Sequence, residues 1–208
     1  MKPVKFSNPR LVAERMLTDE DRPPSPILLH FGEPGIDKTA YIIERLNPRM
    51  KSYLYYKYDQ QLSDEEVGQQ IGYGISAQHV SLMLHSIFKF IRSHFEVSEI
   101  VKTRRVPEKI ESLLFSNYTS SDEILKLPAH EREYYLSTVT DECTPEMKRA
   151  ALAIFRIVAG ELSPDTRELL KAHRKKIEDF KNMTRNEIIC VPWLHHSSLE
   201  EVLAYLNK

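Results

Sequence analysis

The stretch LSDEEVGQQIGYGISAQHVSLMLHSI, residues 62–87, carries the signals of two capped helices joined by a glycine-containing turn. Ser63 followed three residues later by Glu66 forms the capping-box pattern that begins a helix. Gly72 falls where this first helix should end and is expected to adopt a positive φ, and Ser76 is expected to cap the second helix. The sequence therefore predicts a helix-turn-helix.

The two helices are expected to pack closely against each other. Gly68 occupies a position in the first helix where only a small side chain lets the second helix approach. In the second helix Val80, Leu84 and Ile87 recur at helical spacing and are expected to point inward. This pattern leaves the opposite side of the second helix exposed.

The exposed N-terminal part of the second helix is the part that enters the major groove of DNA in this motif. Its side chains are short or polar, and a glutamine can form two hydrogen bonds with adenine, while serine and histidine can donate to or accept from base edges. The expected base-reading residues are Ala77, Gln78, His79 and Ser81.

Charge changes sign along this region. Residues 59–75 contain four acidic residues and no lysine or arginine, whereas residues 76–105 contain five basic residues against two acidic ones. Contacts with phosphates supply most of the affinity of protein–DNA complexes, so a basic flank favours DNA binding. The expected phosphate contacts are Ser76, Lys89, Arg92, Lys102, Arg104 and Arg105.

The same residues resemble known DNA-binding families. Asn47-Pro48, a following helix, the stretch 62–67, Gly72 and the stretch 76–80 look like the DNA-binding region of ParB/KorB-type partition proteins. They are also similar to region 4 of bacterial sigma factors and their phage relatives. The resemblance covers about a quarter of the chain and implies a DNA-binding helix-turn-helix. The turn is longer than is usual, and the arginine box of ParB proteins is not visible, so the resemblance implies no CTP-dependent clamp.

A second motif favours a different function. The stretch ILLHFGEPGIDKT, residues 27–39, resembles the phosphate-binding loop of P-loop NTPases, which lies between a strand and a helix. The alternative nucleotide-binding residues are Gly32, Gly35, Lys38 and Thr39. Asp37 replaces the glycine that normally precedes the lysine and places a carboxylate beside the phosphate position. No apolar strand ends in the acidic residue of a Walker B motif, so nucleotide binding is kept as the alternative function.

Composition limits the class of protein. The chain has 208 residues, of which 41% are hydrophobic and 28% charged, with a formal net charge of −1. A packed core is expected, and any contact with nucleic acid must come from local charge. Cys143 and Cys190 lack metal-ligand spacing, and His195 and His196 are expected to be solvated loop residues. No signal peptide or membrane-spanning run is visible, so we expect a cytoplasmic protein without a metal or other cofactor and without a membrane partner.

The expected fold is mainly α-helical, with three segments: residues 1–46, the helix-turn-helix region 47–106, and a C-terminal helical region 107–208. A small α/β element is expected from short strands near Val4 and Phe6 and at 27–31 and 187–193. The expected C-terminal helices span 107–115, 121–127, 129–138, 147–160, 165–181 and 198–207.

Together these patterns predict a sequence-specific binder of double-stranded DNA rather than an enzyme. It would act as a transcription regulator or as a plasmid or phage partition factor. The C-terminal helices would form a homodimer, and another regulatory protein or RNA polymerase is a further expected partner. The alternatives left open are a degenerate P-loop nucleotide-binding protein of NTPase or kinase type and a non-enzymatic helical interaction module.

Overall fold

The computed structural model describes residues 4–19, 25–72, 74–97, 108, 111–112, 120–138 and 143–208, and these are mainly helical. This part of the chain contains no β-strand, so the expected small α/β element is wrong. The chain forms two compact units, each described below by itself. Unit 1 comprises Met1–Glu96 and Ile189–His195, and unit 2 comprises Val97–Ile188 and His196–Lys208.

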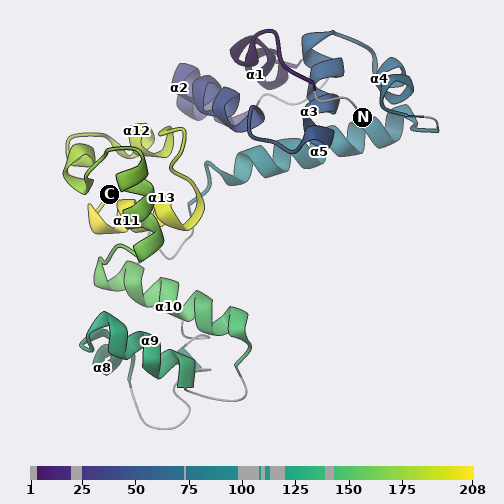
Figure 1. The fold of residues 1–208 in the computed structure, drawn as a ribbon. Helices are drawn as coiled ribbons and strands as arrows, with labels where there is room; N and C mark the ends of the chain where they lie inside the picture. Colours follow the sequence, from purple (N-terminus) through teal and green to yellow (C-terminus); the bar gives the residue numbers. More distant parts are fainter. Residues whose placement is uncertain are drawn as a thin grey trace. The chain divides into compact units, whose positions relative to one another are not determined.

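Unit 1 is built from short helices with clear start signals. Asn8 and Asn47 each cap the helix that follows, with a proline at the first helical position; Asn47 Oδ1 accepts the Met50 N–H at 2.9 Å. The helices (Figure 1) are α1 Pro9–Leu17, α2 Pro26–Ile43, α3 Pro48–Leu54, the π-helix η1 Tyr55–Asp59, α4 Asp64–Ile71 and α5 Ala77–Ser93.

The strand expected at 27–31 is part of α2. Ser25 and Pro26 begin the helix, and its backbone breaks at Gly32, where φ is +54° and ψ is −137°. A short apolar run fits a buried strand and a buried helix equally well, and here the proline at the first helical position decides for the helix. The strand expected near Val4 and Phe6 is also wrong: no neighbouring strand pairs with it in the described residues, and Phe6 instead buries its ring.

The tyrosine-rich stretch after residue 52 is helical and continues the helix expected after Asn47-Pro48. It forms the end of α3 and all of η1, where each hydrogen bond spans one residue more than in an α-helix, as from the Gln60 N–H to the Tyr55 carbonyl. Tyr53 and Leu54 are fully buried, and Tyr58 donates a hydrogen bond to Asp19 Oδ2 at 2.8 Å.

The core of unit 1 forms where α5 packs against α2, α3 and α4, with α1 covering α2 (Figure 1). Its members are apolar side chains spaced at helical periodicity, as burial of one helix face requires. They include Val12, Met16, Ile27, Ile36, Ile43, Leu54, Val67, Val80, Leu84, Ile87 and Ile91.

Unit 2 is also helical. Thr144 and Ser163 cap two of its helices, each followed by a proline at the first helical position. Its helices are α8 Ser121–Leu125, α9 Ala129–Thr138, α10 Pro145–Ala159, α11 Pro164–Ala172, the 3₁₀-helix η2 Ile177–Phe180, α12 Arg185–Ile189 and α13 His196–Tyr205, the last residue of α12 belonging to unit 1. The helix expected at 107–115 lies mostly outside the described residues.

Two expectations for this unit are wrong. The helix expected at 165–181 ends at Ala172, because Arg174 turns the backbone into the left-handed region with φ +52°. The strand expected at 187–193 begins instead as α12. Thr184 and Glu187 form a capping box there, with the Thr184 N–H donating to Glu187 Oε2 at 2.6 Å.

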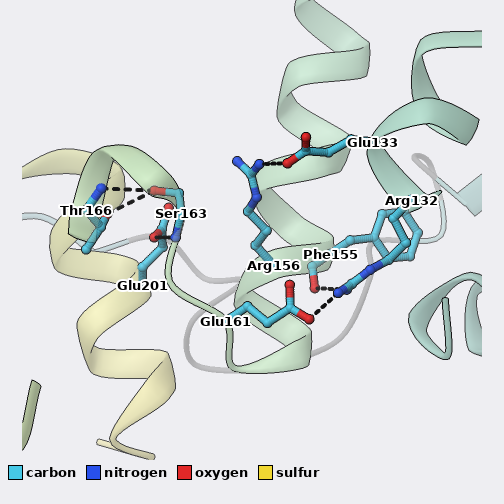
Figure 2. Close-up of polar contacts among 8 residues, drawn as sticks. All are labelled: Arg132, Glu133, Phe155, Arg156, Glu161, Ser163, Thr166 and Glu201. Atoms are coloured by element: carbon cyan, nitrogen blue, oxygen red, sulfur yellow. Dashed lines mark hydrogen bonds and ion pairs between the residues drawn. The ribbon is translucent and has the colours of Figure 1, made fainter. Parts of the chain in front are cut away.

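The helices α8 and α9 pack on α10 around a small apolar core (Figure 1). Two ion pairs cross from α9 to α10 and the residues after it: Arg132 pairs with Glu161, and Arg156 pairs with Glu133 (Figure 2). Arg132 is almost fully buried, and its Nη1 also reaches the Phe155 carbonyl at 3.5 Å. A buried guanidinium that lost its partner would be strongly unfavourable, so these contacts fix how α9 lies on α10.

A buried carboxylate joins α13 to the start of α11. Glu201 Oε2 accepts the Ser163 N–H at 2.6 Å, and the Ser163 hydroxyl accepts the Thr166 N–H at 3.2 Å (Figure 2). The Thr166 hydroxyl in turn donates to Ser198 Oγ at 3.1 Å. Polar groups withdrawn from water need such partners, and here they determine the position of one helix end.

Within the described residues, no helix combines the length and the apolar character that crossing a bilayer requires. Cys143 and Cys190 are both buried, and neither belongs to a disulfide.

Replacing Glu201 with alanine is expected to lower the free energy of unfolding by about 1–3 kcal/mol, because the Ser163 N–H would remain buried without its acceptor. Urea unfolding followed by circular dichroism measures this change. Glu178→Ala, at an exposed site, should change the free energy by less than about 0.5 kcal/mol. Equal effects of the two substitutions would show that the Glu201 contact contributes nothing.

Candidate nucleic-acid interface

The first helix of the pair, α4, begins as expected from the sequence. Ser63 Oγ accepts the Glu66 N–H at 3.3 Å, and the Ser63 N–H donates to Glu66 Oε2 at 2.8 Å. The hydrogen bond from the Ser63 backbone holds the pKa of Glu66 below its ordinary value. The capping box is therefore formed by an ionised glutamate at neutral pH.

Gly68 is the point at which α4 meets the turn before α5. A Cβ on this residue would lie 2.4 Å from the Ile75 carbonyl oxygen, a backbone atom that cannot move aside. The expectation that this position needs a small side chain is confirmed. The contact fixes the start of α5 against the middle of α4.

Gly72 ends α4 as expected, and its N–H donates to the Gly68 carbonyl at 3.1 Å. The expectation of a positive, left-handed φ at Gly72 is wrong, because its φ of 165° and ψ of 161° are extended. The left-handed residue of the turn is Gly74, with φ +82°. The left-handed residue therefore lies two positions later in the turn than expected.

The second helix, α5, is capped by Ser76, whose Oγ accepts the His79 N–H at 3.2 Å. Val80, Leu84 and Ile87 are fully buried, so the inward face is the expected one. On the outward face Gln78, His79 and Ser81 are exposed, while Ala77 is half-buried. The structure thus brings the four expected base-reading residues together on the surface at one helix end.

The structure describes three of the six residues expected to contact phosphates. Ser76 and Lys89 are exposed, and Arg92 forms an exposed ion pair with Glu96 at 2.9 Å. Lys102, Arg104 and Arg105 lie outside the described residues. Along α5 the exposed residues Gln78, Leu82, His85, Lys89 and Arg92 recur three or four positions apart, so they form one stripe down the outward face.

The acidic residues at the start of α4 are largely engaged within the protein. Asp64 forms an ion pair with Lys57 at 2.7 Å, and Glu66 is held by the capping box. From Ala77 to Ser93, α5 contains no aspartate or glutamate. The outward face of α5 therefore presents only neutral and basic side chains of its own.

The four residues of the alternative nucleotide site do not form a phosphate-binding loop. Gly32, Gly35, Lys38 and Thr39 all belong to α2, because the strand and the loop that the motif requires are replaced by helix. Lys38 and Thr39 are fully buried. The apolar run and the glycines that resembled a strand and a loop instead form a helix with a break at Gly32.

Lys38 has an internal role that the sequence did not reveal. Its ammonium group donates to the Ile189 carbonyl and, at 3.0 Å, to the Leu194 carbonyl, and it lies 5.0 Å from the centre of the Phe95 ring. Desolvation by burial lowers the pKa of Lys38 to about 8, against the raising effect of Cys190. The lysine holds the segment 189–195 to α2 and to the residues after α5.

A small hollow of about 250 Å³ lies beside the C-terminal half of α5 in unit 1. Tyr41, Arg45, Phe90, His94 and His195 are among its lining residues, and the rings of His94 and His195 stack with centroids 5.2 Å apart. No local sequence pattern predicts this hollow, because its lining comes from segments far apart in the chain. Of the two histidines expected in a loop, His195 lies in the loop before α13, and His196 begins that helix.

Comparison with known proteins adds no relative: no family model, curated protein or solved structure matches the chain.

Within the described part of the chain, no three histidine, cysteine or acidic side chains lie close enough together to hold a metal ion.

Replacing Gly68 with alanine is expected to lower the stability of unit 1 by about 1–3 kcal/mol, because the added Cβ would overlap the Ile75 carbonyl. Gly72→Ala is the matched control, since a Cβ there would meet only the end of the Ile75 side chain at 3.8 Å. Trp193 is the single tryptophan and lies in unit 1, so its fluorescence during urea unfolding should report both changes. If both glycines tolerate alanine equally, α5 is not fixed by this contact.

The stability of unit 1 is expected to rise between pH 8 and about 10.5, by up to about 3 kcal/mol. In this range the unfolded chain keeps the Lys38 proton while the folded protein, with its pKa of about 8, releases it. The unfolded state then binds more protons, so raising the pH favours folding. Lys38→Met should remove this rise, and the exposed Lys5→Met should retain it, as measured by Trp193 fluorescence in urea at several pH values. A rise of equal size in Lys38→Met would assign it to another group.

Proposed function

We propose that this protein binds double-stranded DNA in a sequence-specific manner through α4 and α5, with α5 as the recognition helix. The observation that carries the proposal is the exposed, Ser76-capped N-terminus of α5, held against α4 by the contact between Gly68 and Ile75. A helix end fixed in this way can enter the major groove as a rigid body.

Gln78 and His79 are the proposed base-reading side chains. Both are exposed in the first turn of α5. The Gln78 amide can form a two-hydrogen-bond pair with adenine, and His79 and Ser81 can bond to base edges. One turn further along, Leu82 has 61% of its surface exposed, which suits apolar contact with a thymine methyl group. Ala77 is small enough to allow the groove wall to approach.

Phosphate contacts would come from both ends of α5. The N-terminus of a helix attracts phosphate through its free N–H groups and its positive dipole end, and the Ser76 hydroxyl lies there. Lys89 lies on the same outward face, and Arg92 can leave its exposed pair with Glu96 for a phosphate at little energetic cost. Lys102, Arg104 and Arg105 are proposed to extend these contacts.

In a cell this activity would make the protein a transcription regulator or a plasmid or phage partition factor, acting in the cytoplasm. One recognition helix covers only a short DNA site, so we propose a homodimer that reads two half-sites. RNA polymerase or another regulatory protein would be the further partner of such a regulator.

The double substitution Gln78→Ala/His79→Ala is expected to abolish sequence preference. A pooled DNA selection with the wild type would first supply a preferred duplex. Fluorescence polarisation at two salt concentrations should then show affinity for it reduced by about 10- to 100-fold or more in the variant, because a good bidentate base contact contributes about 1–3 kcal/mol. Weak, salt-sensitive binding to unrelated duplexes should persist.

His30→Ala/Gln60→Ala is the matched control, since it removes the same two residue types from exposed positions outside α5. It should bind the selected duplex like the wild type. A wild-type protein that enriches no sequence, or a double variant with unchanged preference, would refute recognition by α5.

A further inference from the structure

The C-terminal end of α11 in unit 2 carries the densest positive charge of the described residues. Four of the six positions from 171 to 176 are lysine or arginine, and none is acidic. All four side chains are exposed. We call this group the basic turn, and its members are Lys171, Arg174, Lys175 and Lys176.

The helix dipole explains only part of this charge. Cations are favoured in the last turn of a helix, and Lys171 lies in the last turn of α11. Lys175 and Lys176 follow the end of the helix, where the dipole effect has fallen away. The helix dipole therefore does not account for these two lysines.

Arg174 occupies a backbone position that is unfavourable for an arginine. Its φ is +52°, and its N–H donates to the Lys171 carbonyl at 3.0 Å while the Lys175 N–H donates to the Leu170 carbonyl at 2.9 Å. These hydrogen bonds form a Schellman motif, whose left-handed position usually holds glycine or asparagine. A Cβ there crowds the backbone.

Two other helices of unit 2 end with the same hydrogen bonds and the usual residues. At the end of α10 the left-handed residue is Gly160, with φ +69°, and at the end of α13 it is Asn207, with φ +62°. The chain thus uses favourable residues at two equivalent positions and an arginine at the third. Arg174 lowers local stability while adding charge to the surface.

The charges of the basic turn are not neutralised by the part of the protein that the structure describes. Arg174, Lys175 and Lys176 form no ion pair with any described residue, and Lys171 forms only an exposed contact of 3.7 Å with Glu168. The nearby Asp179 binds the backbone N–H of Lys176 at 2.9 Å rather than a basic side chain. Four cations therefore remain available to an external anion.

We propose that the basic turn binds the phosphate backbone of double-stranded DNA without reading its sequence. This inference rests on the proposed function and gives unit 2 a part in it. Closely spaced lysines and arginines on an exposed turn match a line of phosphates, which DNA presents at short regular intervals. From 171 to 176 the largest apolar residue is Ala172, which argues against a membrane anchor or an apolar protein interface.

The test uses the full-length protein and a 30-base-pair duplex of mixed sequence. Arg174→Gln/Lys175→Gln should weaken binding and make the slope of log affinity against log salt shallower by about two, because each lost phosphate contact removes about one counterion. Lys126→Gln/Arg149→Gln removes the same charge from other exposed positions of unit 2 and should leave both quantities unchanged.

Arg174→Gly separates binding from folding. Glycine relieves the left-handed backbone, so the variant should melt roughly 2–4 °C higher than the wild type while its affinity for the duplex falls. A lower melting temperature together with weaker binding would mean that Arg174 is structural and would overturn the proposal.

The outcomes also separate this inference from the proposed function. Sequence-specific binding with an unchanged salt slope in Arg174→Gln/Lys175→Gln would overturn the role of the basic turn and leave recognition by α5 standing. Binding without sequence preference that this variant weakens would support the basic turn and refute α5 as a reader of sequence. A variant that loses only binding to vesicles containing phosphatidylserine, or only binding to polyglutamate, would overturn the inference in favour of another class of partner.

Discussion

The close approach of Gly68 to the Ile75 carbonyl is the constraint on which the proposed interface depends. The two groups are so near that no side chain fits between them. Because Ile75 lies just before α5, this contact also fixes the start of α5 against α4. The caps at Ser63 and Ser76 determine where each helix begins, and this contact limits how one helix can lie against the other. A recognition surface is useful when its side chains keep their relative positions without a partner. Here the backbone provides that rigidity.

Buried polar groups fix how other helices and segments of each unit lie against one another. In unit 1 the Lys38 ammonium meets two carbonyls of a distant segment. In unit 2 Arg132 joins α9 to α10, and Glu201 joins α13 to the start of α11. Such groups are costly to bury and tolerate few arrangements, which makes them specific rather than strongly stabilising. The apolar residues around them supply most of the driving force for folding.

The sequence predicted those parts of the structure that depend on local chemistry. The capping residues Ser63 and Ser76 identified helix starts, and the spacing of Val80, Leu84 and Ile87 identified the buried face of α5. The predicted secondary structure was wrong where a local pattern fits both a strand and a helix, or where contacts between distant residues determine the structure. The apolar run at 27–31 fits a strand or a buried helix equally well. The apolar run after residue 187 also resembles a strand, but the capping box of Thr184 and Glu187 just before it starts a helix. The sequence does not mark the end of α11, because Arg174 occupies the position where a glycine would have indicated it.

No local pattern could reveal that Lys38 is buried, because its partners lie in a distant part of the chain.

The return of residues 189–195 to unit 1 has a consequence for how the protein is made. Lys38 and its Ile189 acceptor are 151 residues apart, and nearly all of unit 2 lies between them in the sequence. During synthesis, which proceeds at about 5–20 residues per second, the helices of unit 1 leave the ribosome long before this last piece. Until it arrives, the lysine has no carbonyl partners there and its surroundings stay open to water. Residues 1–96 are therefore not a self-sufficient fragment, and unit 1 is completed only when synthesis has passed residue 195.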